Sequence, residues 1–432
     1  MENNVIEANY PITFRQTDAD FLGQHLKNRH SVILIGMKRV GISNFLRFFL
    51  NHGGVIGKYI DNKNRHLFIP VDLNDMVEKE FYPFWILTLK RIGDATSKLK
   101  GKKSLNKYVE DLFLDSIQSK DTFKTLENIR KALVRISQEK IFPTIFFIRF
   151  DRIKDIVTPE FFGNLQGLKD ATHHRLSYVF TSFRSLDKLS PSVFPKSSLP
   201  VFAQNQYMKP AQRKDIETIF ESYRDRYKLS FSIELKNYLF ELVDGYVQYL
   251  QLALICLHER NKNEKDKNDL FELLSKDERI ILQSEELWES LDGKEKPVLL
   301  KVAKDQKITA EEKNSASYLW NTGFIGEKGI FSKLFSEFLK IADAKNVRLL
   351  TDHDVEFSKK ENLLFNFLKT KIGEICEREE IIKAVWAEVE ELGVSDWAID
   401  RLVARLRSKL KTKKSPYEIV TVKTRGYKLL NA

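Results

Sequence analysis

The chain has 432 residues, 42% of them hydrophobic, which is enough apolar material for buried cores and argues against wholesale disorder. At about 150 residues per domain, this length predicts two to four domains. Lysine and arginine number 71 against 60 acidic residues, and two distant cysteines argue against a disulfide scaffold or a structural zinc site. Without a long apolar run or a secretory signal at the N-terminus, we expect a cytoplasmic protein that does not enter a membrane.

The first 205 residues alternate between short apolar runs and helix-like stretches. The apolar runs, typical of strands buried on both faces of a parallel sheet, lie at residues 32–35, 67–71, 145–150 and 177–180. Helical patterns at 44–50 and 122–137 lie between them. This alternation predicts a doubly wound α/β domain over residues 1–205.

A loop bracketed by two glycines follows the first predicted strand and precedes an apolar helix. Gly36 and Gly41 have the spacing of the phosphate-binding pattern G-x-x-x-x-G-K-[ST], in which backbone N–H groups cradle phosphates. Ser43 keeps the hydroxyl that would hold magnesium, but Ile42 stands where the pattern has its lysine. The loop therefore keeps the predicted shape of a nucleotide site and loses its main positive charge.

Charged residues nearby bear on whether such a site hydrolyses ATP. Lys38 or Arg39 would have to fold back from the loop to replace part of the missing lysine charge. Asp151 follows the strand at 145–150, where an acid can hold the water shell of magnesium, but the next residue is Arg152 rather than a water-activating glutamate. We predict little or no ATP hydrolysis, and the sequence leaves nucleotide binding open.

Polar residues also follow the predicted strand at 177–180. Thr181, Ser182 and Arg184 are either sensors of a γ-phosphate or ordinary polar residues at a strand end. The sequence alone does not separate these two interpretations.

Taken together, these features resemble a STAND-type P-loop ATPase, the signalling branch of the AAA+-like superfamily. Residues 206–210 resemble the strand that opens the lid of that family, and residues 243–250 resemble its glycine-x-proline segment, with Val247 in place of the proline. Residues 320–339 resemble the winged helix that closes such ATPases, and residues 13–16 occupy the place of an adenine-side arginine box.

The resemblance covers about residues 10–340 and implies more than the loop itself. It implies a helical lid over residues 206–275 and a first winged helix over residues 276–344. It also implies ATP or ADP with magnesium as the ligand, held at Gly36, Lys38, Gly41, Ser43 and Asp151.

The sign of the charge changes within the last 90 residues. Residues 345–400 contain eight basic and thirteen acidic residues, whereas residues 401–428 contain ten basic residues and one acid, Glu418. Such a basic face on an otherwise neutral fold suits a polyanion. We therefore expect residues 345–432 to form a separate domain that binds nucleic acid.

This last segment has the pattern of three helices followed by two short strands. Apolar residues at helical spacing predict helices at 357–368, 378–389 and 395–410, the third with its inner stripe at Ile399, Val403, Leu406 and Leu410. A hairpin over 418–430 follows. A basic third helix on a small helical core, with a basic hairpin after it, is typical of a winged helix that places its third helix in a major groove.

Four ordered motifs in this segment closely resemble the OmpR/PhoB-type winged-helix output domain of response regulators. The motifs lie at 358–364, 378–386, 399–410 and 419–427. The chain departs from the family at Trp397 and Leu402, where arginine and histidine often face DNA, and at Thr424, which replaces a wing glycine. The resemblance therefore implies DNA binding without indicating which sequence is recognised.

The resemblance assigns DNA-contacting roles by position. It implies contacts with base edges for Arg401, Arg405 and Trp397. It implies contacts with phosphates or the wing groove for Arg407, Lys409, Lys423, Arg425 and Tyr427.

We interpret the chain as a transcriptional regulator that binds double-stranded DNA and is controlled or scaffolded by a degenerate P-loop ATPase-like module, with a homo-oligomer among its expected states. One alternative is an active, ATP-switched STAND regulator. A second alternative is a protein-interaction scaffold in signalling or defence. ATP binding at the Asp151 site would favour the first alternative, and an absence of selective DNA binding would favour the second.

Overall fold

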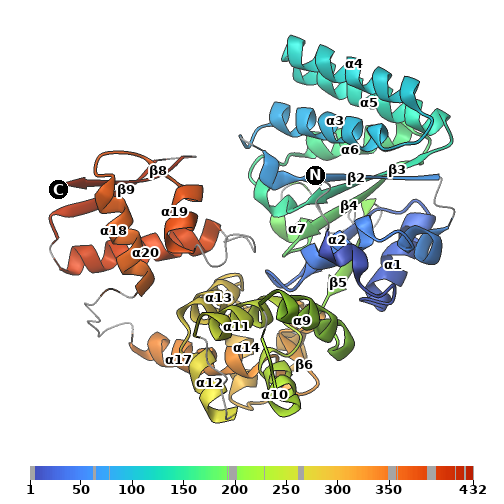
Figure 1. Cartoon of the computed structure of the whole chain (residues 1–432). Helices are drawn as coiled ribbons and strands as arrows, with labels where there is room; N and C mark the ends of the chain where they lie inside the picture. Colours follow the sequence, from blue (N-terminus) through green and yellow to red (C-terminus); the bar gives the residue numbers. More distant parts are fainter. Residues whose placement is uncertain are drawn as a thin grey trace. The chain divides into compact units, whose positions relative to one another are not determined.

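The computed structural model describes most of the chain (Figure 1). The described residues are 5–61, 65–76, 78–191, 193, 202–227, 229–260, 267–348, 357, 359–386, 396–413, 415–422 and 425–431. Contacts divide the chain into two compact units. The first comprises residues 1–222, 245–247 and 318–325, and the second comprises residues 223–244, 248–317 and 326–432.

A five-stranded parallel sheet forms the centre of the first unit, with the strand order β2-β3-β4-β1-β5. The strands are β1 Val32–Gly36, β2 His66–Asp72, β3 Phe142–Ile148, β4 Ser177–Ser182 and β5 Gln204–Met208. β1 lies between β4 and β5, so that Val32 pairs with Val179 on one side and Gln204 on the other. This sheet confirms the predicted α/β fold.

Helices cover both faces of this sheet (Figure 1). One face carries α1 Gln16–Lys27 and α2 Ile42–Asn51, and the other carries α3 Phe81–Ser97, α5 Thr122–Gln138 and α6 Pro159–Ala171. α4 Lys103–Ser119 packs against α3 and α5. Aromatic rings fill the layer between sheet and helices, where the Phe84 ring lies 5.1 Å from that of Phe147 and 4.9 Å from that of Phe161.

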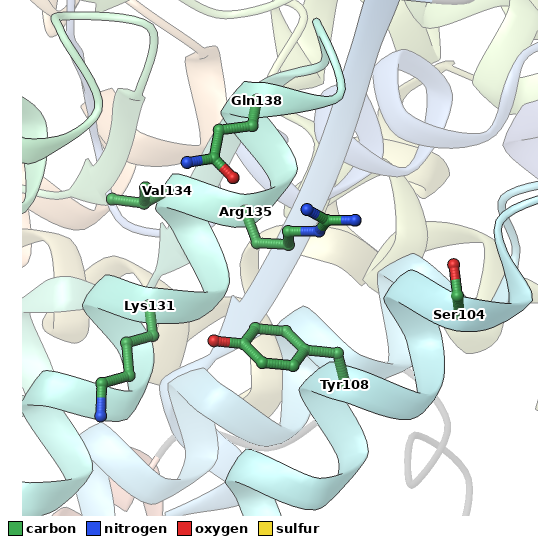
Figure 2. A pocket seen from close by; sticks show the side chains of 6 residues that line it. All are labelled: Ser104, Tyr108, Lys131, Val134, Arg135 and Gln138. Atoms are coloured by element: carbon green, nitrogen blue, oxygen red, sulfur yellow. The ribbon is translucent and has the colours of Figure 1, made fainter.

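A groove of 530 Å³ lies between α4 and α5 (Figure 2). Tyr108 of α4 faces Lys131 and Arg135 of α5 across it. None of these residues belongs to the predicted sites, and nothing in the groove identifies a ligand.

The structure corrects two details of the predicted sheet. β3 ends at Ile148 rather than at residue 150, because Arg149 has a left-handed backbone with φ of 60° that interrupts the extended chain. Asp151 consequently lies in a short 3-10 helix, Phe150–Ile153, and not at the strand end. The predicted boundary at residue 205 falls within β5, which belongs to the sheet.

The segment predicted as lid and first winged helix is mainly helical. Its first part contains α9 Arg213–Tyr227, α10 Ile233–Val243, α11 Val247–Arg260, α12 Lys267–Ser275 and α13 Glu278–Glu289. Its second part contains α14 Glu295–Ala303, α15 Ala310–Ser315, α16 Tyr318–Asn321, β6 Ile325–Gly326, β7 Gly329–Ile330 and α17 Lys333–Arg348. Helices followed by a hairpin and α17 are the element order of a winged helix, while the predicted domain boundaries stay predictions.

The C-terminal domain, in the second unit, combines three helices with a small antiparallel sheet. The helices are α18 Lys359–Thr370, α19 Arg378–Val385 and α20 Asp396–Thr412. The strands β8 Cys376–Glu377, β9 Tyr417–Val422 and β10 Gly426–Asn431 stand in the order β8-β10-β9. This arrangement is the predicted winged helix. Every helix among the described residues is too short or too polar to span a bilayer.

A close approach of two strands requires a glycine at position 426. Gly426 has φ of 153°, and a Cβ placed there would lie 2.1 Å from the carbonyl oxygen of Cys376 on β8. No rotamer relieves such a clash, because the backbone fixes the position of Cβ and the other atom is a backbone carbonyl oxygen. Gly426 therefore allows β10 to pair with β8 and β9 at the same time.

We predict that Gly426→Ala lowers the local stability of the C-terminal sheet by about 2 kcal/mol or more, through strain and steric clash. Gly373→Ala is the matched control, because Gly373 has φ of 83° and open space around its Cβ position, and we expect about 1 kcal/mol there. Hydrogen exchange of the β9 and β10 amides in the full chain measures both losses. Equal losses in the two variants would contradict the steric account.

Candidate functional site

α20 has two faces of different character. Its inner face is apolar and buried, and consists of Ile399, Leu402, Val403, Leu406 and Leu410. Its outer face carries Arg401, with a side chain that is 42% exposed, beside the exposed Ala404 and Ser408. Leu402, which the sequence marks as a departure from the family, belongs to this buried inner face. Arg401 is thus partly exposed on the face opposite the core.

A buried carboxylate holds two further cations of α20. Glu361 of α18 is fully buried, and its two oxygens accept hydrogen bonds from Arg405 Nε at 3.2 Å and Lys409 Nζ at 2.9 Å. An unpaired carboxylate in the core would be costly. Glu361 therefore holds Arg405 at its Nε and Lys409 at its Nζ. The sequence places Glu361 in a family motif but gives no sign of this role, since its partners lie 44 and 48 residues away.

Arg407 connects α20 to the wing formed by β9 and β10. Its Nε donates to a backbone carbonyl of β9 at 2.7 Å, and its Nη2 donates to Thr421 Oγ1 at 2.7 Å. The guanidinium thus lies sideways from the helix. Arg425 is exposed in the turn between the two strands, whereas Lys423 and the side chain of Trp397 lie outside the described residues.

The structure corrects the role expected of Tyr427. Its side chain lies in the domain core with 3% of the residue exposed, and its hydroxyl donates to Asp400 and accepts from Arg378 Nη2 at 3.2 Å. Burial raises the pKa of Tyr427 above its usual range. A buried phenol held in this way ties α20 to β10, which favours a structural role for Tyr427.

The phosphate loop of the first unit has the predicted shape. Gly36 ends β1, and a Cβ at this position would lie 2.8 Å from Val40 Cγ1, so that the loop closes only over a glycine. Gly41, with φ of 110°, precedes α2, and Ser43 lies in the first turn of that helix. The side chain of Ile42 turns back over the loop, 3.3 Å from the same Cβ position, and presents methyl groups where a lysine would bring charge.

Three residues from other segments surround this loop. The Tyr246 hydroxyl donates to the carbonyl oxygen of Lys38 at 2.6 Å, and Val247 packs so closely that a Cβ on Gly41 would lie 2.7 Å from its Cγ2. Arg15 is 5% exposed, and its Nη1 lies 3.9 Å from the same Cβ position. Among the described residues this buried nitrogen has no hydrogen-bond partner, which fits an anionic group beside the loop.

Asp151 lies in an environment that does not favour its charge. Burial raises the pKa of its carboxyl group, against the lowering effect of three nearby cations, Lys38, Arg149 and Arg152. Arg149 is itself committed to an ion pair with Asp72. A carboxyl group with a raised pKa is a poorer magnesium ligand than an ordinary aspartate.

The polar residues after β4 have structural partners. Thr181 Oγ1 accepts from the Arg149 backbone N–H at 2.8 Å, and Ser182 Oγ accepts from the Arg184 N–H at 3.1 Å. The Arg184 guanidinium lies 3.8 Å from the centre of the Tyr318 ring. These contacts favour polar strand-end residues over sensors of a γ-phosphate.

The residues around the loop fit a nucleotide in shape and only partly in charge. The backbone cradle and the orphaned Arg15 Nη1 suit a phosphate or another anionic group of a ligand. The side chain at position 42 and the pKa of Asp151 do not suit phosphoryl transfer, which depends on the loop lysine and on a bound metal. Among the described residues, no cluster of three side chains has the make-up of a metal site.

Comparison with known proteins decides the class of the C-terminal domain. Residues 352–429 match the model of the family described as "Transcriptional regulatory protein, C terminal". The C-terminal domain is a transcriptional-regulator winged helix. The chain thus joins a domain matched to transcriptional regulatory proteins to a parallel α/β domain. No curated protein matches the chain.

Three solved structures illustrate which known folds the chain is similar to. The ORC2 protein of Aeropyrum pernix, in ADPNP–ADP complexes, is 13% identical with a TM-score of 0.45, covering 80% of this chain and 98% of that one. The Walker-type ATPase PABY2304 of Pyrococcus abyssi is 15% identical with a TM-score of 0.43, covering 76% and 95%. Domain III of the replication initiation protein DnaA of Thermotoga maritima is 19% identical with a TM-score of 0.34, covering 61% and 90%.

We predict that Ile42→Lys raises the affinity for Mg-ATP at least about tenfold, because it returns a positive charge to the phosphates. Ile42→Met is the control of similar length without charge, and we expect it to bind as the unaltered chain does. Equilibrium binding of a fluorescent ATP analogue measures both. The unaltered chain should hydrolyse ATP below about 0.1 s⁻¹, and a faster turnover abolished by Asp151→Ala would contradict this account.

Proposed function

We propose that this protein is a DNA-binding transcriptional regulator whose C-terminal winged helix reads DNA through α20. The observation that carries the proposal is the outer face of α20, where Arg401 is exposed and Arg405 and Lys409 are held along one flank by Glu361. This face belongs to a domain matched to transcriptional regulatory proteins over residues 352–429. A basic helix on a winged-helix core has the geometry to enter a major groove.

The proposed contacts with DNA are of two kinds, to base edges and to the phosphate backbone. Arg401 and Arg405 are assigned to base edges, because their guanidinium groups extend from the outer face and flank of α20, and Trp397 keeps the same assignment from the sequence. Phosphate contacts are assigned to Arg407, Lys409, Lys423 and Arg425, which lie along α20 and in the wing segment. Tyr427 has no direct contact in this scheme, since it lies in the core.

The P-loop module acts in this proposal as a degenerate STAND-type scaffold or sensor. ATP or ADP with magnesium is its proposed ligand, bound by the loop from Gly36 to Ser43 with Arg15 beside it, and bound without turnover. The orphaned Arg15 Nη1 supports binding, while Ile42 argues against hydrolysis. Occupancy of the loop would then influence the DNA-binding domain through the chain's own conformational equilibrium.

The proposal predicts different losses for a base-contacting and a phosphate-contacting arginine. A preferred sequence is first selected with the full chain from a pool of randomised duplexes. Arg401→Ala should weaken binding to that sequence by about 1–3 kcal/mol and leave binding to a scrambled duplex almost unchanged. Arg425→Ala, the control at the wing tip, should weaken binding to both duplexes by similar amounts.

Two outcomes would change the assignment. Equal losses on both duplexes for Arg401→Ala would show that Arg401 contacts phosphate only. A selection that enriches no sequence, with weak and equal binding to all duplexes, would contradict the regulator and favour a protein-interaction scaffold.

A further inference from the structure

Two carboxylates of α13 face the cations that the proposed function assigns to DNA. Glu285 Oε2 lies 3.5 Å from Arg401 Nε and 3.9 Å from Arg405 Nη1. Glu278 Oε1 lies 3.7 Å from Arg405 Nη2. Both helices belong to the second unit of the chain. Arg401 and Arg405 of α20 thus have acidic partners from outside the C-terminal domain.

The spacing of these residues shows that one side of α13 faces one side of α20. Glu278 and Glu285 are seven residues apart, about two helical turns, so that they lie on the same side of α13. Arg401 and Arg405 are four residues apart and share one side of α20. The two acids therefore present a short acidic stripe to a short basic stripe.

The contact with α13 uses the donor atoms of Arg405 that DNA would also need. Its Nε is committed to Glu361 within the C-terminal domain, so that Nη1 and Nη2 are the atoms directed to an external partner. Those two atoms are the ones that approach Glu285 and Glu278. A guanine edge or a phosphate needs the same N–H groups. While α13 lies against α20, its carboxylates stand where a guanine edge or a phosphate would approach these atoms.

The contact is also of a strength that DNA can displace. Its distances of 3.5–3.9 Å exceed those of a tight charged hydrogen bond, and the arginine side chains are 42% and 27% exposed. Partly exposed pairs of this kind are weak and screened by salt. They lower the population of chains with a free α20 without preventing binding.

We propose that the acidic stripe of α13, Glu278 and Glu285, is an internal docking site for α20 that competes with DNA for Arg401 and Arg405. The inference rests on the proposed DNA binding by α20 and adds a regulatory surface to it. Any ligand that draws α13 away from α20 raises DNA affinity, and DNA binding releases α13 in turn.

The test measures DNA binding by the full chain after the acidic stripe has been neutralised. Fluorescence anisotropy at low salt compares the unaltered chain with the double variant Glu278→Gln/Glu285→Gln on the selected duplex and on a scrambled one. The control, Glu272→Gln/Glu289→Gln, changes the net charge equally at acids that pair with Lys276 and Lys296 instead.

We expect the double variant to bind the selected duplex about threefold to tenfold more tightly, and the control to change by less than about twofold. The difference should shrink as salt screens the ion pairs. Selective binding that is equal in the unaltered chain and the double variant would overturn the docking site while leaving the proposed function intact. Binding that is unselective in every protein would overturn both.

Discussion

The buried carboxylate of Glu361 is the constraint on which the DNA-binding face depends. A charge in the core must be paired, and here the partners are Arg405 and Lys409, so that the core determines where these cations stand. The Nη atoms of Arg405 approach carboxylates outside the C-terminal domain. Arg407 and Tyr427 also fix the position of α20, because their hydrogen bonds join it to the wing. The basic face is thus oriented by packing and not only by charge composition.

The first unit shows how a phosphate loop can keep its shape while losing its chemistry. Gly41 has a positive φ that other residues rarely adopt, and Gly36 leaves no room for a Cβ beside Val40, so both glycines support the shape of the loop. Ile42 removes the charge on which phosphoryl transfer depends, and Asp151 sits where burial opposes ionisation. These features are consistent with a module that responds to an anionic ligand, or simply supports the chain, without consuming ATP.

Sequence patterns predicted the strands and helices, because these depend on the spacing of nearby apolar residues. The buried runs gave four strands of the sheet, and the apolar stripe of the third helix gave its inner face. The contacts that the sequence did not indicate join distant residues: the burial of Tyr427, the stacking of Arg184 on Tyr318, and the pairing of Glu361 with cations more than 40 residues away. Leu402, a departure from the family pattern, is a further buried residue that the predicted inner stripe did not include. The acids of α13 have no signal in the sequence at all.

The central claim is that this chain binds DNA selectively through its C-terminal winged helix. The most direct measurement is fluorescence anisotropy of the full chain on the DNA upstream of its own gene and on a scrambled duplex, across a salt series with and without Mg-ATP. The account predicts tighter binding to the upstream duplex with a steep salt dependence, because several phosphates are contacted. Weak binding that is equal on both duplexes would contradict it and indicate a protein partner.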